Sequence, residues 1–262
     1  MGKPDSTDCL TLNVTSALWE RGAIKNRLLG DAVLGVIDVT GHGVYIVHRK
    51  NISFLAAGSV SWTKGPLMWS PAECGCYLTE DSFVTIHSNT TYNVQEFATD
   101  DQHWKEKDRW PSMSTQRRNP GCGATKNLLI VAGGVSGWDE VLASVEVFNI
   151  DTRALRRGAA MNQPRALFRL VSVGSTYPRL LAVGGHNGTS ILESSEWYEQ
   201  EENEWNFGPA LQKGRDSFSA LIISPDIACT EAVPPAHACP TVGGGQNCPF
   251  HNTTGLRVLD YD

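Results

Sequence analysis

The sequence predicts an all-β fold built from repeated units of four short antiparallel strands. The stretches Ser144–Arg165 and Ser194–Arg215 align without a gap at an offset of 50 residues. Short apolar or alternating runs are separated by clusters of Gly, Pro, Asn and Ser, which are signals for strands and turns. No stretch has sustained helical periodicity, and 25 Gly and 13 Pro interrupt the chain throughout. A repeat near fifty residues indicates units that bury their apolar faces against their neighbours.

The two best units share a pattern of residue types. In each, an apolar strand ends in a double glycine, and the ungapped stretch follows after a polar loop. The double glycines are Gly133–Gly134 and Gly184–Gly185. The matched pairs that follow are Glu146 with Glu196, Phe148 with Tyr198, Leu155 with Trp205, Gly158 with Gly208, Met161 with Leu211, and Arg165 with Arg215.

Weaker copies of the same pattern lie upstream. Trp19 and Trp62 take the place of Trp205, and each is followed three residues later by a glycine. A further copy around Trp104 carries three extra residues before its methionine. We therefore expect Trp19, Trp62 and Trp205 to hold equivalent positions between neighbouring units.

Four strands are expected within one unit. They are Leu170–Val173, Arg179–Val183, a third strand around Glu196–Glu199 and a fourth around Trp205. Repeated units of four antiparallel strands describe the blades of a β-propeller. For 262 residues and about 50 residues per blade, five to six blades are expected.

We expect one domain with an irregular insert at 225–240. The approximate units are 9–30 (partial), 31–72, 73–117, 118–165, 166–215 and 216–262 (partial). The sequence begins on one predicted third strand and ends on another. Either the two ends complete one ring with a redundant strand, or the chain is a fragment of a longer, incomplete propeller, and the fragment is slightly preferred.

The double glycine, the Glu-x-Tyr/Phe pair, the Trp, and then Gly, Met and Arg resemble the kelch motif. The match is good in Leu128–Arg165 and Leu180–Arg215. It is partial around Asp31–Met68, which lacks the double glycine and is followed by Ala72 where Arg is expected. It is weak around Cys74–Arg117. The resemblance implies a kelch-type β-propeller.

The resemblance also implies structural roles for the motif residues. The glycines allow a tight exit from the second strand, the aromatic residues pack between blades, and the Arg lies at the entry to the next blade. Glycine adopts backbone angles that other residues avoid. The residues concerned are Gly133, Gly134, Gly184, Gly185, Phe148, Tyr198, Trp19, Trp62, Trp205, Arg165 and Arg215.

Most proteins with this motif are interaction modules, so the resemblance implies a non-enzymatic scaffold that binds a protein partner through its loops. Exposed aromatic residues on loops are frequent anchors of interfaces. The candidates after the double glycines are Trp138, Asp139, Glu140, His186 and Asn187. Packing of Trp138 against an adjacent blade is the alternative for that residue. The alternative function is a propeller enzyme or carbohydrate-binding protein of galactose-oxidase-like architecture, with a site at the central mouth.

The charge pattern and the motifs exclude several other classes. Net charge is −6 and there is no basic run, so a nucleic-acid partner is not expected. No apolar run approaches about 18 residues, so no membrane span is expected. Common nucleotide, metalloprotease and hydrolase motifs are absent from the sequence, and we expect no cofactor or metal. The histidines His48, His87, His186 and His251 could line one rim, but exposed loop residues on separate blades are the simpler interpretation.

Two signals bear on the cellular compartment. Asn-x-Ser/Thr sequons and seven cysteines favour an extracellular or secreted glycoprotein. The N-terminal segment lacks the apolar core of a secretory signal, so this interpretation assumes a truncated start. A cytoplasmic location is the alternative, because propeller loops are rich in Asn, Ser and Thr in any case. The sequons are at Asn13, Asn51, Asn89, Asn187 and Asn252.

Overall fold

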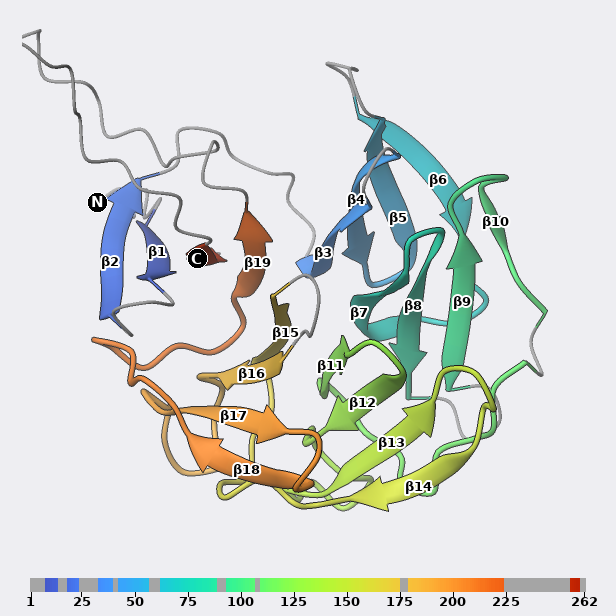
Figure 1. Cartoon of the computed structure of the whole chain (residues 1–262). Coiled ribbons are helices and arrows are strands. Elements are labelled where there is room, and N and C mark those ends of the chain that lie inside the picture. The colour runs from blue at the N-terminus through green and yellow to red at the C-terminus, as the bar shows by residue number, and fades with distance from the viewer. Residues whose placement is uncertain are drawn as a thin grey trace, which may run out of the picture.

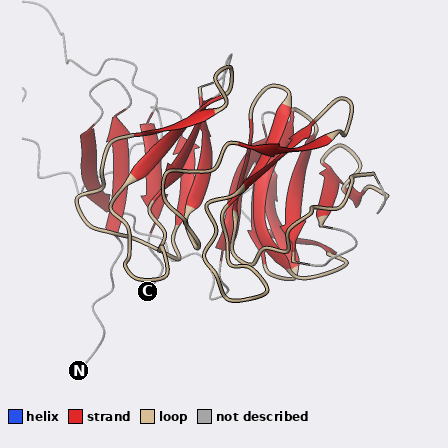
Figure 2. Ribbon diagram, turned by 90° about the horizontal axis from the view of Figure 1, so that it is seen from below, coloured by secondary structure: helices blue, strands red, loops and turns tan. Residues whose placement is uncertain are grey.

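The computed structural model describes residues 8–13, 18–23, 33–39, 42–56, 62–88, 93–106, 109–174, 179–223 and 255–259. Within these ranges every helix or strand element is a β-strand. The strands form five antiparallel sheets of four strands each. Figure 1 shows the sheets arranged in a ring, and Figure 2 shows the same ring from the side, with loops gathered at two faces. The predicted all-β propeller of four-stranded blades is confirmed.

Each blade is named by its strands, in order from the centre of the ring outward. The β3–β6 blade comprises β3 (Val33–Val39), β4 (Gly43–His48), β5 (Asn51–Ala56) and β6 (Thr63–Leu67). The β7–β10 blade comprises β7 (Ala72–Thr79), β8 (Ser82–His87), β9 (Val94–Ala98) and β10 (His103–Trp104). The β11–β14 blade comprises β11 (Gly121–Ala124), β12 (Leu128–Ala132), β13 (Val145–Asn149) and β14 (Leu155–Gly158). The β15–β18 blade comprises β15 (Arg169–Val173), β16 (Arg179–Val183), β17 (Ser195–Glu199) and β18 (Glu204–Phe207).

The fifth sheet takes strands from distant parts of the sequence. Its order is β19 (Ser219–Ile223), β20 (Gly255–Leu259), β1 (Asp8–Asn13) and β2 (Leu18–Ala23). β1 pairs antiparallel with β20. The innermost strands β3, β7, β11, β15 and β19 each contact the next, and β19 contacts β3, so the ring is continuous. The predicted insert at 225–240 lies outside the described residues.

The double glycines adopt backbone angles that explain their residue type. Gly133 and Gly184 both have φ of +60°, in the left-handed region. A Cβ atom on Gly184 would lie 2.5 Å from the carbonyl oxygen of Arg215, and one on Gly133 would lie 2.3 Å from that of Arg165. Only glycine combines this conformation with so close an approach. The second strands β12 and β16 can therefore end directly against the entry to the next blade.

Aromatic side chains fill the space between neighbouring blades. Phe148 and Tyr198 are fully buried, and Trp205 lies 5.0 Å from Tyr198 between ring centroids. Tyr198 and Trp205 belong to one apolar cluster with residues of the β11–β14 blade. Burial of such large side chains is a dominant favourable contribution to folding.

The three tryptophans that the sequence places in one register differ in the structure. Trp205 lies in β18 directly opposite Tyr198. Trp62 precedes β6, next to the regular pair of Phe54 with Thr63, and it is half-buried. Trp104, in β10, is the residue that matches Trp205, since it lies opposite the buried Phe97. Trp19 lies in β2, where only the backbone is described.

Candidate functional site

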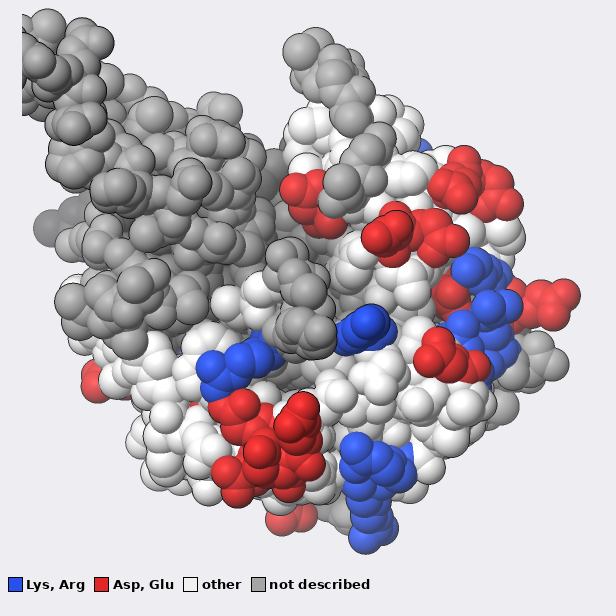
Figure 3. Space-filling view, in the orientation of Figure 1, with Lys and Arg blue, Asp and Glu red and all other residues white. Residues whose placement is uncertain are grey.

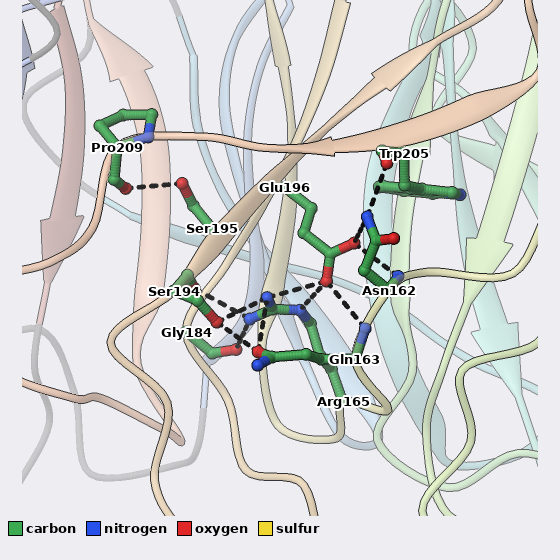
Figure 4. A network of polar contacts seen from close by, with 9 residues as sticks. All are labelled: Asn162, Gln163, Arg165, Gly184, Ser194, Ser195, Glu196, Trp205 and Pro209. Carbon is green, nitrogen blue, oxygen red and sulfur yellow. Dashed lines mark hydrogen bonds and ion pairs between the residues drawn. The ribbon is translucent and has the colours of Figure 1, made fainter.

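A buried ion pair supports the base of each of two neighbouring loops. In the β15–β18 blade, the side chain of Arg165 is 0% exposed and its Nη1 donates to the carbonyl oxygens of Gly184, at 2.8 Å, and Ser194, at 2.9 Å. Its Nε and Nη2 donate to Oε1 of Glu196 at 3.1 and 2.9 Å. Figure 4 shows this network. Arg165 therefore ties the two ends of the loop after β16 to the entry of the blade.

Glu196 is held from a second side by the segment that precedes Arg165. The backbone N–H of Asn162 donates to Oε2 of Glu196 at 2.7 Å, and that of Gln163 donates to Oε1 at 3.2 Å. The Asn162 side chain also bridges Glu196 to the carbonyl oxygen of Trp205 at 2.6 Å. The buried carboxylate thus has a full set of donors, which a charge in the interior requires.

The preceding blade repeats this arrangement. Arg117 donates to the carbonyl oxygens of Gly133 and Ser144 at 2.9 and 2.8 Å, and its Nη2 lies 3.3 Å from Oε1 of Glu146. Burial lowers the pKa of the Arg117 guanidinium, and the nearby charge of Glu146 opposes that shift. Glu146 and Glu196 are therefore the counter-ions of the motif arginines. Two features of the sequence mark these glutamates as motif residues. They are 50 residues apart, and each lies two residues before the aromatic residue of its unit.

The β7–β10 blade replaces the same pair with neutral residues. Ala72 stands where the arginine is expected, and the buried Gln95 takes the place of the glutamate. The Oε1 atom of Gln95 accepts the backbone N–H of Trp69 at 3.4 Å. This blade therefore lacks both the arginine and the glutamate of the pair, so neither charge is buried without its partner.

The loop after β12 carries Trp138 on a firmly held backbone. Val135 forms backbone bridges with Arg118 and with Val141. The Ser136 hydroxyl accepts the backbone N–H groups of Trp138 and Glu140, each at 3.2 Å. The Trp138 side chain is nevertheless 93% exposed, so it does not pack against the adjacent blade.

Asp139 and Glu140 complete this loop. Asp139 has φ of +61°, and its carboxylate forms an exposed ion pair with Arg118. Glu140 is exposed. Arg118 did not stand out in the sequence, because only the folded chain brings it beside Asp139.

The loop after β16 lies beside the Trp138 loop. A Cβ atom on Gly188 would lie 3.3 Å from Cγ2 of Val141, so the two loops are in contact. His186 forms backbone bridges with Ala166 and Ile191. The Asn187 Oδ1 atom accepts the backbone N–H groups of Thr189 and Ser190, each at 2.9 Å.

The structure therefore brings the five predicted loop residues onto two touching loops. It adds an apolar residue that sequence reasoning missed, Ile191, whose side chain is 55% exposed. Together, Trp138, Asp139, Glu140, His186, Asn187 and Ile191 form a surface that we name the loop face.

The other candidate residues are dispersed. Asn51 begins β5, and Asn13 ends β1, where only the backbone is described. Asn89, Asn252 and His251 lie outside the described residues. His87 is buried between Thr85 and Ser70, and burial lowers its pKa. The described part of the chain holds no cluster of three or more metal-ligating side chains.

The described surface carries charges of both signs (Figure 3) and a cavity on its outer side. Figure 3 shows groups of acidic and groups of basic side chains next to one another on the described part of the surface turned to the viewer. A cavity of about 320 Å³ is lined by His103, Lys105, Glu106 and Arg109, on and after the outermost strand β10. Over the described ranges, no helix is long and apolar enough to cross a membrane.

Comparison with known proteins bears on the two best-matched units. The Kelch motif family model matches residues 116–162 and 168–212. A Kelch repeat and BTB domain-containing protein of Caenorhabditis elegans is 32% identical over 107 residues, which are 37% of this chain and 18% of that protein. The Kelch repeat-containing protein kel-10 of the same organism is 27% identical over 117 residues, or 44% and 20% of the two chains. An F-box/kelch-repeat protein of Arabidopsis thaliana is 33% identical over 94 residues, or 34% and 22%.

The similar segments thus span about a fifth of the length of these relatives, as the covered shares of 18%, 20% and 22% show. The two Kelch motif matches coincide with the β11–β14 and β15–β18 blades, where the double glycines and the buried arginine pairs are found. The motif matches, the relatives and the ring of four-stranded blades agree with the resemblance seen in the sequence. The chain contains Kelch motifs at 116–162 and 168–212, and it is similar to kelch-repeat proteins over segments of 94 to 117 residues.

Proposed function

We propose that the chain is a non-enzymatic scaffold that binds a protein partner through the loop face, with Trp138 as its main anchor. The observation that carries the proposal is the combination of a 93% exposed tryptophan with a backbone held at both ends of its loop. An exposed tryptophan is unusual on a soluble surface and is enriched among the residues that dominate binding energy.

The fixed backbone matters because ordering a loop on binding costs free energy. The Ser136 hydroxyl and the pairing of Arg118 with Val135 already order the Trp138 loop in the free protein. A partner that buries the indole therefore loses little of the binding energy to loop ordering. Ile191 on the adjoining loop offers a second apolar contact. The names of two relatives join kelch repeats to a BTB domain or an F-box, which suits an interaction module.

Replacing Trp138 with alanine should weaken binding of the main partner by roughly thirtyfold or more, the usual cost of losing a dominant interface tryptophan. Immobilised wild-type and Trp138→Ala proteins would be compared for retained proteins by quantitative mass spectrometry, and the affinity of each retained protein would then be measured by calorimetry. Phe207→Ala is the matched control, because Phe207 is also exposed but lies on the outer strand β18. Equal affinity of every retained protein for wild type and Trp138→Ala would refute the proposal.

We also propose an extracellular or secreted location, with the cytoplasm as the alternative. The sequons support it, as does the disulfide between Cys74 and Cys122, since such bonds persist in oxidising compartments. Asn187 is the sequon within the loop face, where a bulky glycan would narrow access to Trp138. If the partner binds through Trp138, we expect Asn187 to carry no glycan. A glycan on Asn187 would instead shift recognition to the opposite rim.

Glycan mapping by mass spectrometry on protein from a secretory host distinguishes these cases. A secreted protein is expected to carry glycans on at least some of Asn13, Asn51, Asn89, Asn187 and Asn252. The matched control is the same protein treated with a glycosidase. Complete lack of modification at all five asparagines would remove the main support for an extracellular location, and it would leave the loop face bare.

A further inference from the structure

The disulfide between Cys74 and Cys122 joins the innermost strands of two neighbouring blades. Cys74 lies in β7 and Cys122 in β11, 48 residues apart in sequence. Their Cα atoms are 6.2 Å apart, within the range of about 4.4–6.8 Å that a disulfide spans. The side chains are only 3% and 4% exposed. The bond is thus a buried covalent link between the β7–β10 and β11–β14 blades.

The same two strands position the Trp138 loop. Glu73 precedes Cys74, and its Oε2 atom accepts the backbone N–H of Asn119 at 3.0 Å. Asn119 follows Arg118, whose backbone N–H and carbonyl pair with Val135 at 2.9 and 2.7 Å. Val135 begins the loop that carries Trp138. A short run of contacts therefore connects the linked strands to the loop face.

We propose that the redox conditions during folding decide whether the Cys74–Cys122 disulfide, which we call the staple, is formed. When formed, the staple holds the segment that enters β11 against β7 and thereby fixes the backbone of the Trp138 loop. This regulation rests on the proposed binding role of the loop face. Because both sulfur atoms are buried, small thiols and disulfides reach them only when the blades separate. The redox state is therefore set as the chain folds and is kept by the folded protein.

Formation of the bond requires an oxidant, for which we name a small-molecule disulfide such as oxidised glutathione. The thiolate of one cysteine attacks a sulfur of this disulfide, whose S–S bond breaks and releases one thiolate. The thiolate of the other cysteine then attacks the mixed disulfide, and the second small thiolate leaves. Two electrons pass from the protein thiols to the oxidant, and the two protons lost by the protein are taken up by the released thiolates.

A third cysteine provides a matched control. Cys76 lies two residues after Cys74 in the same buried cluster and carries a free thiol. Burial raises its pKa, which keeps the thiol protonated and therefore a poor nucleophile toward the neighbouring bond. Removal of Cys76 should leave the staple intact, whereas removal of Cys122 abolishes it.

The test compares protein folded in oxidised glutathione with protein folded in reductant. Peptide mapping of alkylated protein should find Cys74 joined to Cys122 only in the oxidised form. Amide hydrogen exchange at 116–119 and 135–141 should be roughly fivefold slower in the oxidised form, since the staple opposes local opening. Cys122→Ala should abolish the difference and Cys76→Ala should retain it. Absence of the cross-linked peptide, or equal exchange in the two forms, would overturn the proposal.

These measurements need no partner, so their outcome is distinct from that of the binding experiment. Slower exchange in the oxidised form supports the staple even if Trp138→Ala leaves all binding unchanged. Where a partner has been identified through Trp138, its affinity should be higher for the oxidised form than for the reduced form. Equal affinity would overturn the link between the staple and binding.

Discussion

Replacing Arg165 with alanine is expected to lower the free energy of unfolding by roughly 3–5 kcal/mol, the usual cost of breaking a buried ion pair from one side. Arg165 and Glu196 are both 0% exposed. The substitution leaves the Glu196 carboxylate in the interior without its cation, and it also leaves the carbonyl oxygens of Gly184 and Ser194 without the donor shown in Figure 4. Denaturant titration followed by circular dichroism measures the loss.

Two further variants make this prediction specific. Arg179→Ala removes a half-exposed arginine paired with Glu199, and it should cost at most about 1 kcal/mol because solvent screens that pair. Arg165→Ala combined with Glu196→Gln imitates Ala72 and Gln95 of the β7–β10 blade and should recover part of the loss. Equal losses for Arg165→Ala and Arg179→Ala would show that burial of the pair is not what stabilises the blade.

Trp205→Ala is expected to cost a similar amount, roughly 3–5 kcal/mol, because it removes a large side chain from the packing between two blades. Trp205 is 5% exposed and lies against Tyr198. Its indole N–H donates to the carbonyl oxygen of Ala159 in the preceding blade at 3.0 Å. The loss combines a cavity, a half-buried carbonyl oxygen left without its donor, and a broken contact between blades.

Trp138→Ala serves as the control for this substitution, since it removes the same side chain from a site that is 93% exposed. Its effect on the free energy of unfolding should stay within about 0.5 kcal/mol. The two variants therefore separate the stabilising role of Trp205 from the proposed binding role of Trp138. An unfolding midpoint unchanged by Trp205→Ala would contradict the packing described between these blades.

The sequence by itself determined the class of fold and the best two units. The offset between Glu146 and Glu196 and the double glycines are local patterns, and they follow from packing requirements that the β11–β14 and β15–β18 blades share. A tight strand exit requires glycine, and the space between blades requires aromatic side chains. Both requirements concern residues that are close together in the chain, so the sequence alone indicates where they are met. The burial of the tryptophans did not follow, because Trp62 is half-buried whereas Trp205 is 5% exposed, and spacing does not show how closely neighbouring blades pack.

Only the tertiary structure decided which distant residues meet. It pairs Cys74 with Cys122, brings the arginine of one entry segment onto the glutamate of a third strand, and joins β1 with β20 in one sheet. It also places the Trp138 loop against Gly188 of the next blade and leaves the indole exposed. Contacts of this kind depend on how the blades pack around the ring. Neither residue types nor their spacing encode that packing locally, and so the candidate site took its form only in the folded chain.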